Sequence, residues 1–231
     1  LNMMMTILGS LLRYLTLMRA EITSHGSVVK RASKCQIETL NSESKKKGKR
    51  KMPSKSTSVN SRKRKSYLKN LYRDIQEIID TTLHRISMYS EDASSLIFNT
   101  GLVESGYRAI MQYPSKIARS FWQVESATAF DIFENYLRYR KSIWYDVIDA
   151  CNLDSKYKEN IPTREECTEL LTTNIAFAVC MARLVYRRVP KRLPKASDLE
   201  SQAEYWVKYY NAGGKGTVGK FVEAVNPDML A

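Results

Sequence analysis

Histidine is the scarcest chemically useful residue of this sequence. The 231 residues include two histidines, His25 and His84. Zinc sites are commonly built on histidine, and a serine hydrolase triad needs histidine as its base. This scarcity argues against a histidine-based metal site and against a Ser-His-Asp triad.

Paired cysteines are also missing. The four cysteines form no C-x-x-C pair and repeat no spacing, so the sequence indicates neither a zinc site nor a disulfide framework. We therefore expect an activity that needs neither a metal nor another cofactor. The four are Cys35, Cys151, Cys167 and Cys180.

Alternation of apolar and polar residues, which is typical of a half-buried strand, does not occur over any useful length. From Ser66 onward, apolar residues recur instead at helical spacing, which predicts one mainly α domain over 66–231, built of about seven helices. The predicted helical stretches are 67–86, 90–105, 126–140, 142–151, 162–188, 197–211 and 217–225.

Three helix starts carry capping signals. Ser90 precedes acidic residues, which suit the positive end of the helix dipole. Thr163 with Glu166, and Ser197 with Glu200, each match the capping box, in which the first residue and the acid three positions later satisfy each other's backbone N–H groups.

Positive charge is confined to one part of the chain. The formal net charge is +13, yet residues 1–65 hold 16 Lys and Arg against three Asp and Glu, while residues 66–231 hold 21 of each. A charge argument for binding nucleic acid therefore applies only to the N-terminal segment.

The N-terminal segment 1–65 has two pieces. Residues 3–18 are apolar but are interrupted by Arg13, too short to span a bilayer and without a basic stretch before them, so we expect an amphipathic or buried helix rather than a signal peptide. Residues 42–66 contain almost no apolar side chains, and we expect them to be disordered. They are either a solvated basic linker or a contact for phosphates of DNA, anionic lipid or anionic cell-wall polymers.

Glu104 is the most informative acid. It falls seven residues after Ile97 and three after Gly101, so it lies on or beside the buried face of its helix. A carboxylate held away from water there has a raised pKa and can protonate a glycosidic oxygen near neutral pH. The alternative is an exposed residue where the helix runs out at Gly106.

Four short motifs follow one another along the chain. They are ES at 104–105, ARSFWQVESATA at 118–129, NIAFAVCMARL at 174–184 and YNAG at 210–213. The series resembles the lytic transglycosylases of the lysozyme-like superfamily, in which a Glu-Ser ends a helix, a GLMQ-x-x-P-A-T-A stretch follows, an N-I opens a later core helix and A-Y-N-A-G closes the cleft. The resemblance spans about 110 residues and implies a lysozyme-like, transglycosylase-type helical domain.

The stretch 183–224 further resembles a branch of such proteins found among virion-associated proteins of tailed bacteriophages. The sequence departs from the family pattern at SFWQ, where Ser120, Phe121 and Trp122 replace Gly, Leu and Met, and at Ser126, where the proline would stand. These departures bear on substrate fit more than on the acid.

The resemblance implies a role for each matching residue. Glu104 would be the catalytic acid and then the base that deprotonates the sugar's own 6-hydroxyl. Ser105 would hold the cleft backbone or the N-acetyl region, and Gln123 would hydrogen-bond a sugar amide or backbone. Tyr210 would orient Glu104 or contact the sugar, and Asn211 would form a turn with Gly213 beside the substrate.

Other residues have simpler expected roles. A hydrolase would need a second carboxylate, for which Glu125, Asp131 and Glu134 are candidates, although each is also explained as a solvated position on the helix that follows. Asn174 is expected to cap or brace neighbouring backbone. The aromatic residues over 205–210 are expected to include core positions.

Two classes of function are consistent with these features. The first is a peptidoglycan-cleaving transglycosylase or muramidase carried in a phage virion, which acts on glycan strands at the host periplasm and cell wall. The second is a non-catalytic virion protein that retains the fold and binds DNA or neighbouring subunits through its basic arm. A third option is a lysis enzyme released late in infection, against which the lack of an export signal counts.

Overall fold

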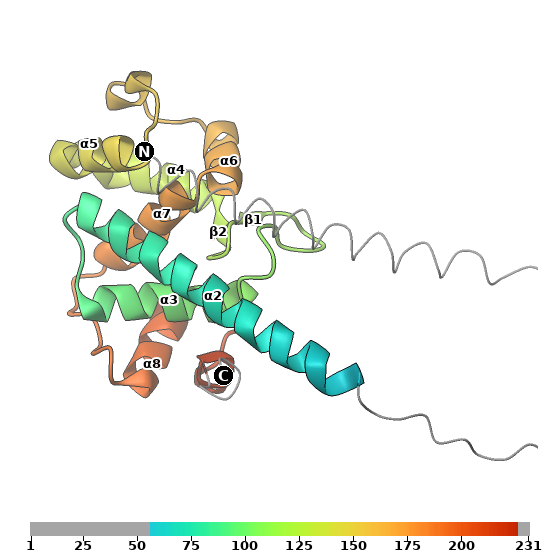
Figure 1. Cartoon of the computed structure of the whole chain (residues 1–231). Coiled ribbons are helices and arrows are strands. Elements are labelled where there is room, and N and C mark those ends of the chain that lie inside the picture. Colours follow the sequence, from blue (N-terminus) through green and yellow to red (C-terminus); the bar gives the residue numbers. More distant parts are fainter. Residues whose placement is uncertain (1–55, 226–231) are drawn as a thin grey trace, which may run out of the picture. The chain divides into compact units, whose positions relative to one another are not determined.

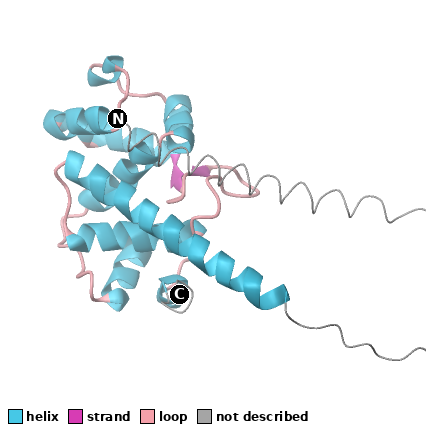
Figure 2. Ribbon diagram, viewed as in Figure 1, coloured by secondary structure: helices cyan, strands magenta, loops and turns pink. Residues whose placement is uncertain are grey.

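The computed structural model describes residues 56–225, which are mainly helical, as the sequence predicts (Figures 1 and 2). The long helices in chain order are α2 (Ser56–Arg85), α3 (Glu91–Ser105), α4 (Ser126–Asn135), α5 (Lys141–Ala150), α6 (Arg164–Thr173), α7 (Ile175–Arg187), α8 (Leu199–Tyr209) and α9 (Val218–Val225). The 3-10 helices η1 (Leu137–Tyr139) and η2 (Ser155–Lys158), and the strands β1 (Ala118–Arg119) and β2 (Val124–Glu125), complete the set.

The start of α2 corrects one prediction. Residues 56–66 are helical, although they fall in the stretch 42–66 that the sequence predicts to be disordered. They contain no proline or glycine, and Lys and Arg are good helix formers, so an existing helix extends through them at little cost. The predictions for 1–55, including the apolar stretch and most of the basic arm, lie outside the described residues.

Helix α7 forms the centre of the core. Ten of its residues are buried, and α3, α4, α5 and α6 all pack against it (Figure 1). Phe177 of α7 stacks on Phe133 of α4 with ring centroids 6.1 Å apart, and Phe133 meets the edge of Trp144 of α5. A helix that is apolar on nearly all sides is stable only when neighbours cover it, which is the arrangement seen here.

The predicted helix 162–188 is in fact two helices, which corrects a second prediction. Asn174 ends α6 and caps α7, and the two axes are bent by 114°. Its Oδ1 accepts a hydrogen bond from the backbone N–H of Phe177 at 3.0 Å, and its Nδ2 donates to the carbonyl of Cys151 at 2.9 Å. Asparagine side chains compete with the helix for backbone partners, which breaks an otherwise periodic stretch. The expected capping or bracing role of Asn174 is confirmed.

Of the three helix caps predicted from the sequence, the structure contains two. Ser90 caps α3, and Thr163 and Glu166 form the predicted capping box of α6. The second predicted box, Ser197 with Glu200, is wrong because Asp198 caps α8 instead. One carboxylate oxygen of Asp198 accepts from the backbone N–H of Ser201 at 3.0 Å and the other accepts from its hydroxyl at 2.7 Å. Aspartate is as good a cap as serine. The Ser201 hydroxyl gives Asp198 a second hydrogen bond, so the cap of α8 lies one residue later than predicted.

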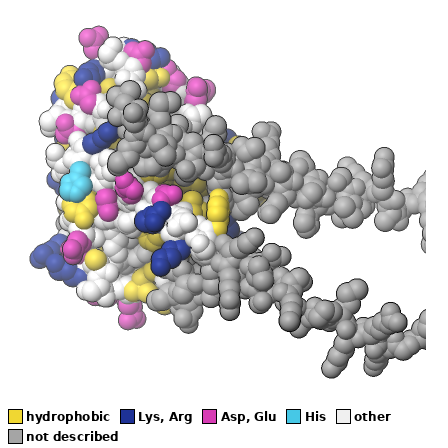
Figure 3. All heavy atoms as spheres, in the orientation of Figure 1, with side chains coloured by type: hydrophobic (Ala, Val, Ile, Leu, Met, Phe, Trp, Pro, Cys, Tyr) yellow, Lys and Arg dark blue, Asp and Glu magenta, His cyan; other side chains and the backbone are white. Residues whose placement is uncertain are grey.

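Two short features complete the description. Helix α4 ends at Asn135, earlier than the predicted end at 140, and η1 follows it. Within residues 56–225 no single helix is long and apolar enough to cross a membrane, although the bent pair α6 and α7 together meets that criterion by length and composition. Figure 3 shows one face of the molecule. Lys and Arg side chains lie among Asp and Glu side chains there, which agrees with the balanced charge of residues 66–231.

The double role of Asn174 gives a graded prediction. Asn174→Ala removes both the cap and the brace and should lower the free energy of unfolding by about 2 kcal/mol. Asn174→Asp keeps the capping oxygen but loses the donor to Cys151, so it should cost about half as much. Denaturant unfolding monitored by circular dichroism measures both. Asn160→Ala, which removes a single exposed bond to the carbonyl of Lys156, is the control. Equal losses in the two Asn174 variants would contradict this division of roles.

Candidate active site

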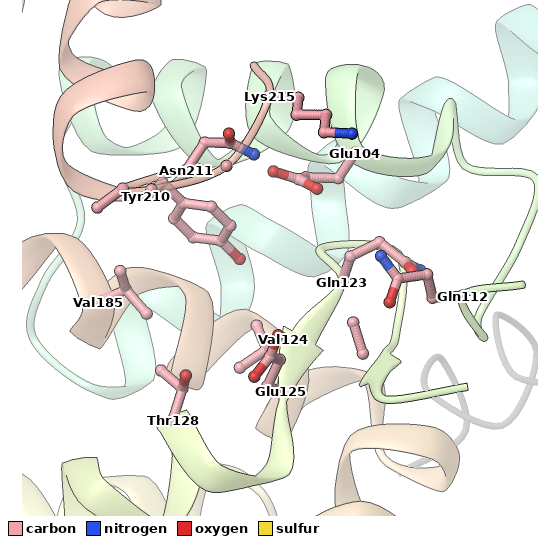
Figure 4. A pocket seen from close by; sticks show the side chains of 14 residues that line it. Glu104, Gln112, Gln123, Val124, Glu125, Thr128, Val185, Tyr210, Asn211 and Lys215 are labelled. Carbon is pink, nitrogen blue, oxygen red and sulfur yellow. The ribbon is translucent and has the colours of Figure 1, made fainter. Parts of the chain in front are cut away.

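A cleft of about 550 Å³ opens where the end of α3, the β1–β2 hairpin and the loop after α8 meet (Figure 4). Four of the five predicted site residues line it: Glu104, Gln123, Tyr210 and Asn211. They come from three separate parts of the chain that span more than a hundred residues, and Figure 4 shows them around one opening. The fifth, Ser105, is not among the lining residues.

Glu104 is held in this cleft by a tryptophan. The indole N–H of Trp206, on α8, donates a hydrogen bond of 2.9 Å to Oε1 of Glu104. Burial raises the pKa of Glu104 from 4.5 to about 7, and the Trp206 hydrogen bond opposes that rise by stabilising the ionised form. The carboxyl group is thus only partly exposed, unlike the freely solvated helix-terminal residue that was the alternative.

The position of Glu104 depends on how α3 ends. Gly106 adopts a left-handed conformation with φ +58°, and its N–H bonds to the carbonyl of Leu102 at 2.9 Å, which closes the helix directly after Ser105. The Ser105 hydroxyl donates to the carbonyl of Phe121 at 2.7 Å and accepts from the N–H of Tyr107 at 3.1 Å. Ser105 therefore fixes the hairpin loop to the helix end, and its hydroxyl is already occupied by backbone groups.

The loop 120–123 of the hairpin carries the unusual SFWQ sequence. Ser120 and Gln123 both have positive φ values, +66° and +48°, a region that favours glycine. The amide nitrogen of Gln123 donates to the carbonyl of Ser120 at 2.7 Å, and Trp122 lies in the core with its indole bound to the carbonyl of Ile97 at 2.8 Å. The hairpin itself was not predicted, because two-residue strands are too short to show alternation.

In the described part of the chain, Tyr210 forms a hydrogen bond with the hairpin loop 120–123 and none with Glu104. Its hydroxyl donates to the carbonyl of Trp122 at 2.8 Å, and its ring lies 5.1 Å from that of Tyr186. Burial raises the pKa of Tyr210 well above its usual value, and the charge of nearby Glu104 raises it further. Within residues 56–225 no hydrogen bond joins Tyr210 to Glu104, so the orienting part of its predicted role belongs to Trp206.

The glycine-rich loop after α8 packs closely against Trp206. The carbonyl of Asn211 accepts from the N–H of Gly214 at 2.8 Å, which forms the predicted turn around Gly213. Oδ1 of Asn211 accepts from the N–H of Gly216 at 2.9 Å. A Cβ at Gly216 would lie 2.3 Å from the indole of Trp206, and one at Gly214 would lie 2.2 Å from Oδ1 of Asn211. These positions therefore need glycine because backbone and side chain approach too closely for any larger residue.

Trp206 is the site residue that the sequence prediction missed. It was assigned only to an aromatic core stripe, and it does pack in the core against Ala203 and Phe221. The available signal was its spacing: it precedes Tyr210 by four residues, so the two share one face of α8.

The structure also sorts the three candidate second carboxylates. Glu125, at the start of α4, lines the cleft together with Thr128, and Figure 4 shows both across the opening from Glu104. Asp131 pairs with Arg188, and Glu134 pairs with Arg138 at 2.7 Å. Of the three, only Glu125 lines the cleft.

The described residues offer no metal centre. Among residues 56–225 no group of three or more His, Cys, Asp or Glu side chains could hold a metal ion. The three cysteines in this range are free thiols, and burial raises the pKa of Cys167 to about 12, which keeps it protonated. The cleft itself offers carboxyl, amide, phenol and amine groups.

Comparison with protein-family models, curated proteins and solved structures finds no match to this chain. The class of protein is consequently inferred from two things. One is the chemistry of the cleft described above. The other is the series of short sequence motifs, whose residues Glu104, Gln123, Tyr210 and Asn211 lie together in that cleft.

Gly216 gives the first prediction for the site. Gly216→Ala forces a methyl group into the Trp206 ring, so it should lower the free energy of unfolding by about 1–3 kcal/mol, the usual cost of overpacking. The control is Gly219→Ala in α9, whose nearest neighbouring atom would be 4.0 Å away. Alanine is the better helix former, so this control should be neutral or stabilising. Chemical denaturation with tryptophan fluorescence measures both, and equal effects would show that Gly216 does not position Trp206.

Glu104 gives the second prediction. Because its pKa is about 7 when folded and near 4.5 when unfolded, the folded protein retains a proton between these pH values that the unfolded chain has lost. Stability should therefore fall as pH rises from 4.5 to 7 and then level off, by about 3 kcal/mol in total. Glu104→Gln should remove this decline and become relatively more stable at pH 8.

The measurement is the unfolding free energy at pH 5 and pH 8. Glu134→Gln, a change of the same chemistry at the surface pair with Arg138, is the control and should keep the decline. Parallel pH curves for the wild type and Glu104→Gln would mean that Glu104 does not hold this proton.

Proposed function

We propose that this protein is a peptidoglycan-cleaving enzyme of the lytic transglycosylase or muramidase kind, with a lysozyme-like fold and Glu104 as its acid and base. The observation that carries the proposal is a half-buried carboxyl group with a pKa of about 7 at the edge of an open cleft. A group with this pKa is present in both protonation states near neutral pH, so it can give a proton and take one back.

The chemistry needs a single carboxyl group. Protonated Glu104 donates its proton to the glycosidic oxygen, the bond from that oxygen to the anomeric carbon breaks, and positive charge develops on the sugar ring. The sugar's 6-hydroxyl then closes on the anomeric carbon and gives its proton to the Glu104 carboxylate, which restores the acid. No water is consumed. The indole N–H of Trp206 supports the ionised carboxylate between the two steps.

The cleft walls suit a sugar chain bearing hydroxyl and amide groups. Gln123, Asn211 and Tyr210 place amide and phenol groups beside Glu104, and Lys215 adds a cation on the same side (Figure 4). Groups of this kind orient a polar ligand through hydrogen bonds. Peptidoglycan glycan strands carry hydroxyl and amide groups that such side chains can bind. We therefore propose these strands as the partner, in line with the fold inferred from the motifs.

A hydrolytic variant is favoured by one specific observation. Glu125 and Thr128 line the cleft across from Glu104, where a second carboxylate can activate a water molecule for attack on the anomeric carbon. This second candidate uses the same acid and the same substrate. It differs in the product, because water is added to the sugar.

The proposed setting follows the resemblance of residues 183–224 to virion-associated phage proteins. A phage particle would carry the enzyme and open the host wall at the periplasm, with other virion proteins as neighbours. The non-catalytic virion protein, binding DNA or other subunits through residues 42–66, is the competing proposal. Loss of cleavage on substitution of Glu104 separates the two.

The deciding experiment is digestion of purified peptidoglycan by the full chain. Glu104→Gln should reduce turnover by a factor of about a hundred or more, whereas Glu134→Gln should leave it unchanged. Mass spectrometry of the fragments then assigns the route, since 1,6-anhydromuramoyl ends lack the one water that reducing ends contain. Reducing ends that vanish in Glu125→Gln would select the hydrolytic variant. An inactive wild type, or an active Glu104→Gln variant, would contradict catalysis by Glu104.

A further inference from the structure

Arg183 is a buried cation without a partner. It lies on α7 with 8% of its surface exposed, and its Nε and Nη1 atoms are buried and have no hydrogen-bond acceptor. Among the described side chains, those of residues 66–225, no other nitrogen or oxygen is left in this state. A guanidinium group does not lose its proton in proteins, so the side chain stays charged.

An unpaired buried charge calls for a physical explanation. Removing a charged group from water is costly, and buried charges in proteins are normally paired with an opposite charge or fully hydrogen-bonded. Methionine or leucine would fill the same place on α7 without that cost. The retained arginine therefore indicates a partner that the described residues do not supply.

The surroundings of Arg183 are cationic. A cavity of about 200 Å³, separate from the catalytic cleft, is lined by Arg183, Arg187 and Lys191, together with Tyr186, Val189 and Leu193. No carboxylate lines it.

The two acids that neutralise cations of the same basic stretch are already engaged elsewhere. Asp131 pairs with Arg188 and Asp92 with Lys195. Neither acid lines the cavity, so its three cations remain available to a ligand.

Several elements hold these cations together. Arg187 is close enough for its charge to lower the pKa of Arg183, an effect to which burial contributes most. The Tyr205 hydroxyl donates to the carbonyl of Lys191 at 3.3 Å, which ties the loop after α7 to α8. The repelling cations are therefore kept together by the fold.

We propose that this cavity, defined by Arg183, Arg187 and Lys191, binds the phosphate group of a small ligand. Three cations without an acid suit a group that carries close to two negative charges and several acceptor oxygens, and guanidinium groups match phosphate oxygens well. The volume of about 200 Å³ has room for one phosphate group. The site is independent of the basic segment 42–66 and of the proposed catalysis.

The first test is calorimetric titration of the full chain with inorganic phosphate at constant ionic strength. The wild type should bind one phosphate, and Arg183→Gln and the exposed-site variant Arg187→Ala should each bind at least tenfold more weakly. Lys220→Ala removes an exposed cation on α9 outside the cavity and should bind as the wild type does. Absence of binding to the wild type, or binding by the Arg183 and Arg187 variants that is as tight as wild-type binding, would overturn the proposal.

Further titrations identify the ligand class. If the natural ligand is a phosphate monoester, glycerol 3-phosphate should bind at least as well as inorganic phosphate. If the natural ligand is the free phosphate ion, glycerol 3-phosphate should bind more weakly. Acetate should bind at least tenfold more weakly than either. Acetate binding equal to phosphate binding would overturn the assignment to phosphate.

Thermal unfolding supplies a second readout that a purely structural role would not give. Phosphate should raise the Tm of the wild type and of Lys220→Ala, but not of Arg183→Met or Arg187→Ala. Without phosphate, Arg183→Met should be at least as stable as the wild type, because an unpaired buried charge is gone. A destabilised Arg183→Met variant together with a phosphate-insensitive wild type would show that Arg183 has only a structural role.

Discussion

The hydrogen bond from the Trp206 indole to Glu104 is the contact on which the cleft depends. It joins α8 to the last turn of α3, two elements about a hundred residues apart in the chain. Burial raises the pKa of the carboxyl group to about 7, while the indole N–H keeps the ionised form accessible. A carboxylate without this donor would be held still more strongly in its protonated form, and one in open water would be ionised at neutral pH.

The hairpin loop 120–123 is the second constraint, and the ends of two helices, α3 and α8, contact it. Ser105 donates to the carbonyl of Phe121, Tyr210 to that of Trp122, and Gln123 to that of Ser120. Three of the five residues that the motifs single out thus hold the backbone of one short loop. The motif residues are therefore in large part the supports that place one wall of the cleft opposite Glu104, and fewer of them are free to bind a ligand.

The sequence predicted the helices well where the determining interaction joins residues that are close together in the chain. Helical spacing gave the α-rich character, and the caps at Ser90 and Thr163 were correct because a capping side chain reaches only two or three residues. The errors arose where two local options compete. Asn174 breaks a periodic stretch by bonding to Cys151, 23 residues earlier, and Asp198 displaces Ser197 as a cap through a second donor. The hairpin has strands of two residues and left no pattern to detect.

The sequence by itself determined which residue types were available: one well-placed glutamate, few histidines, and a series of short motifs in a fixed order. Only the tertiary structure decided what they do. It gave Glu104 its raised pKa, because desolvation depends on neighbours that are distant in the chain, and it turned Trp206 from a core aromatic into the donor for that acid. It also left Arg183 buried without an acceptor, since burial and hydrogen-bond pairing are properties of the packed chain and have no signature in local spacing.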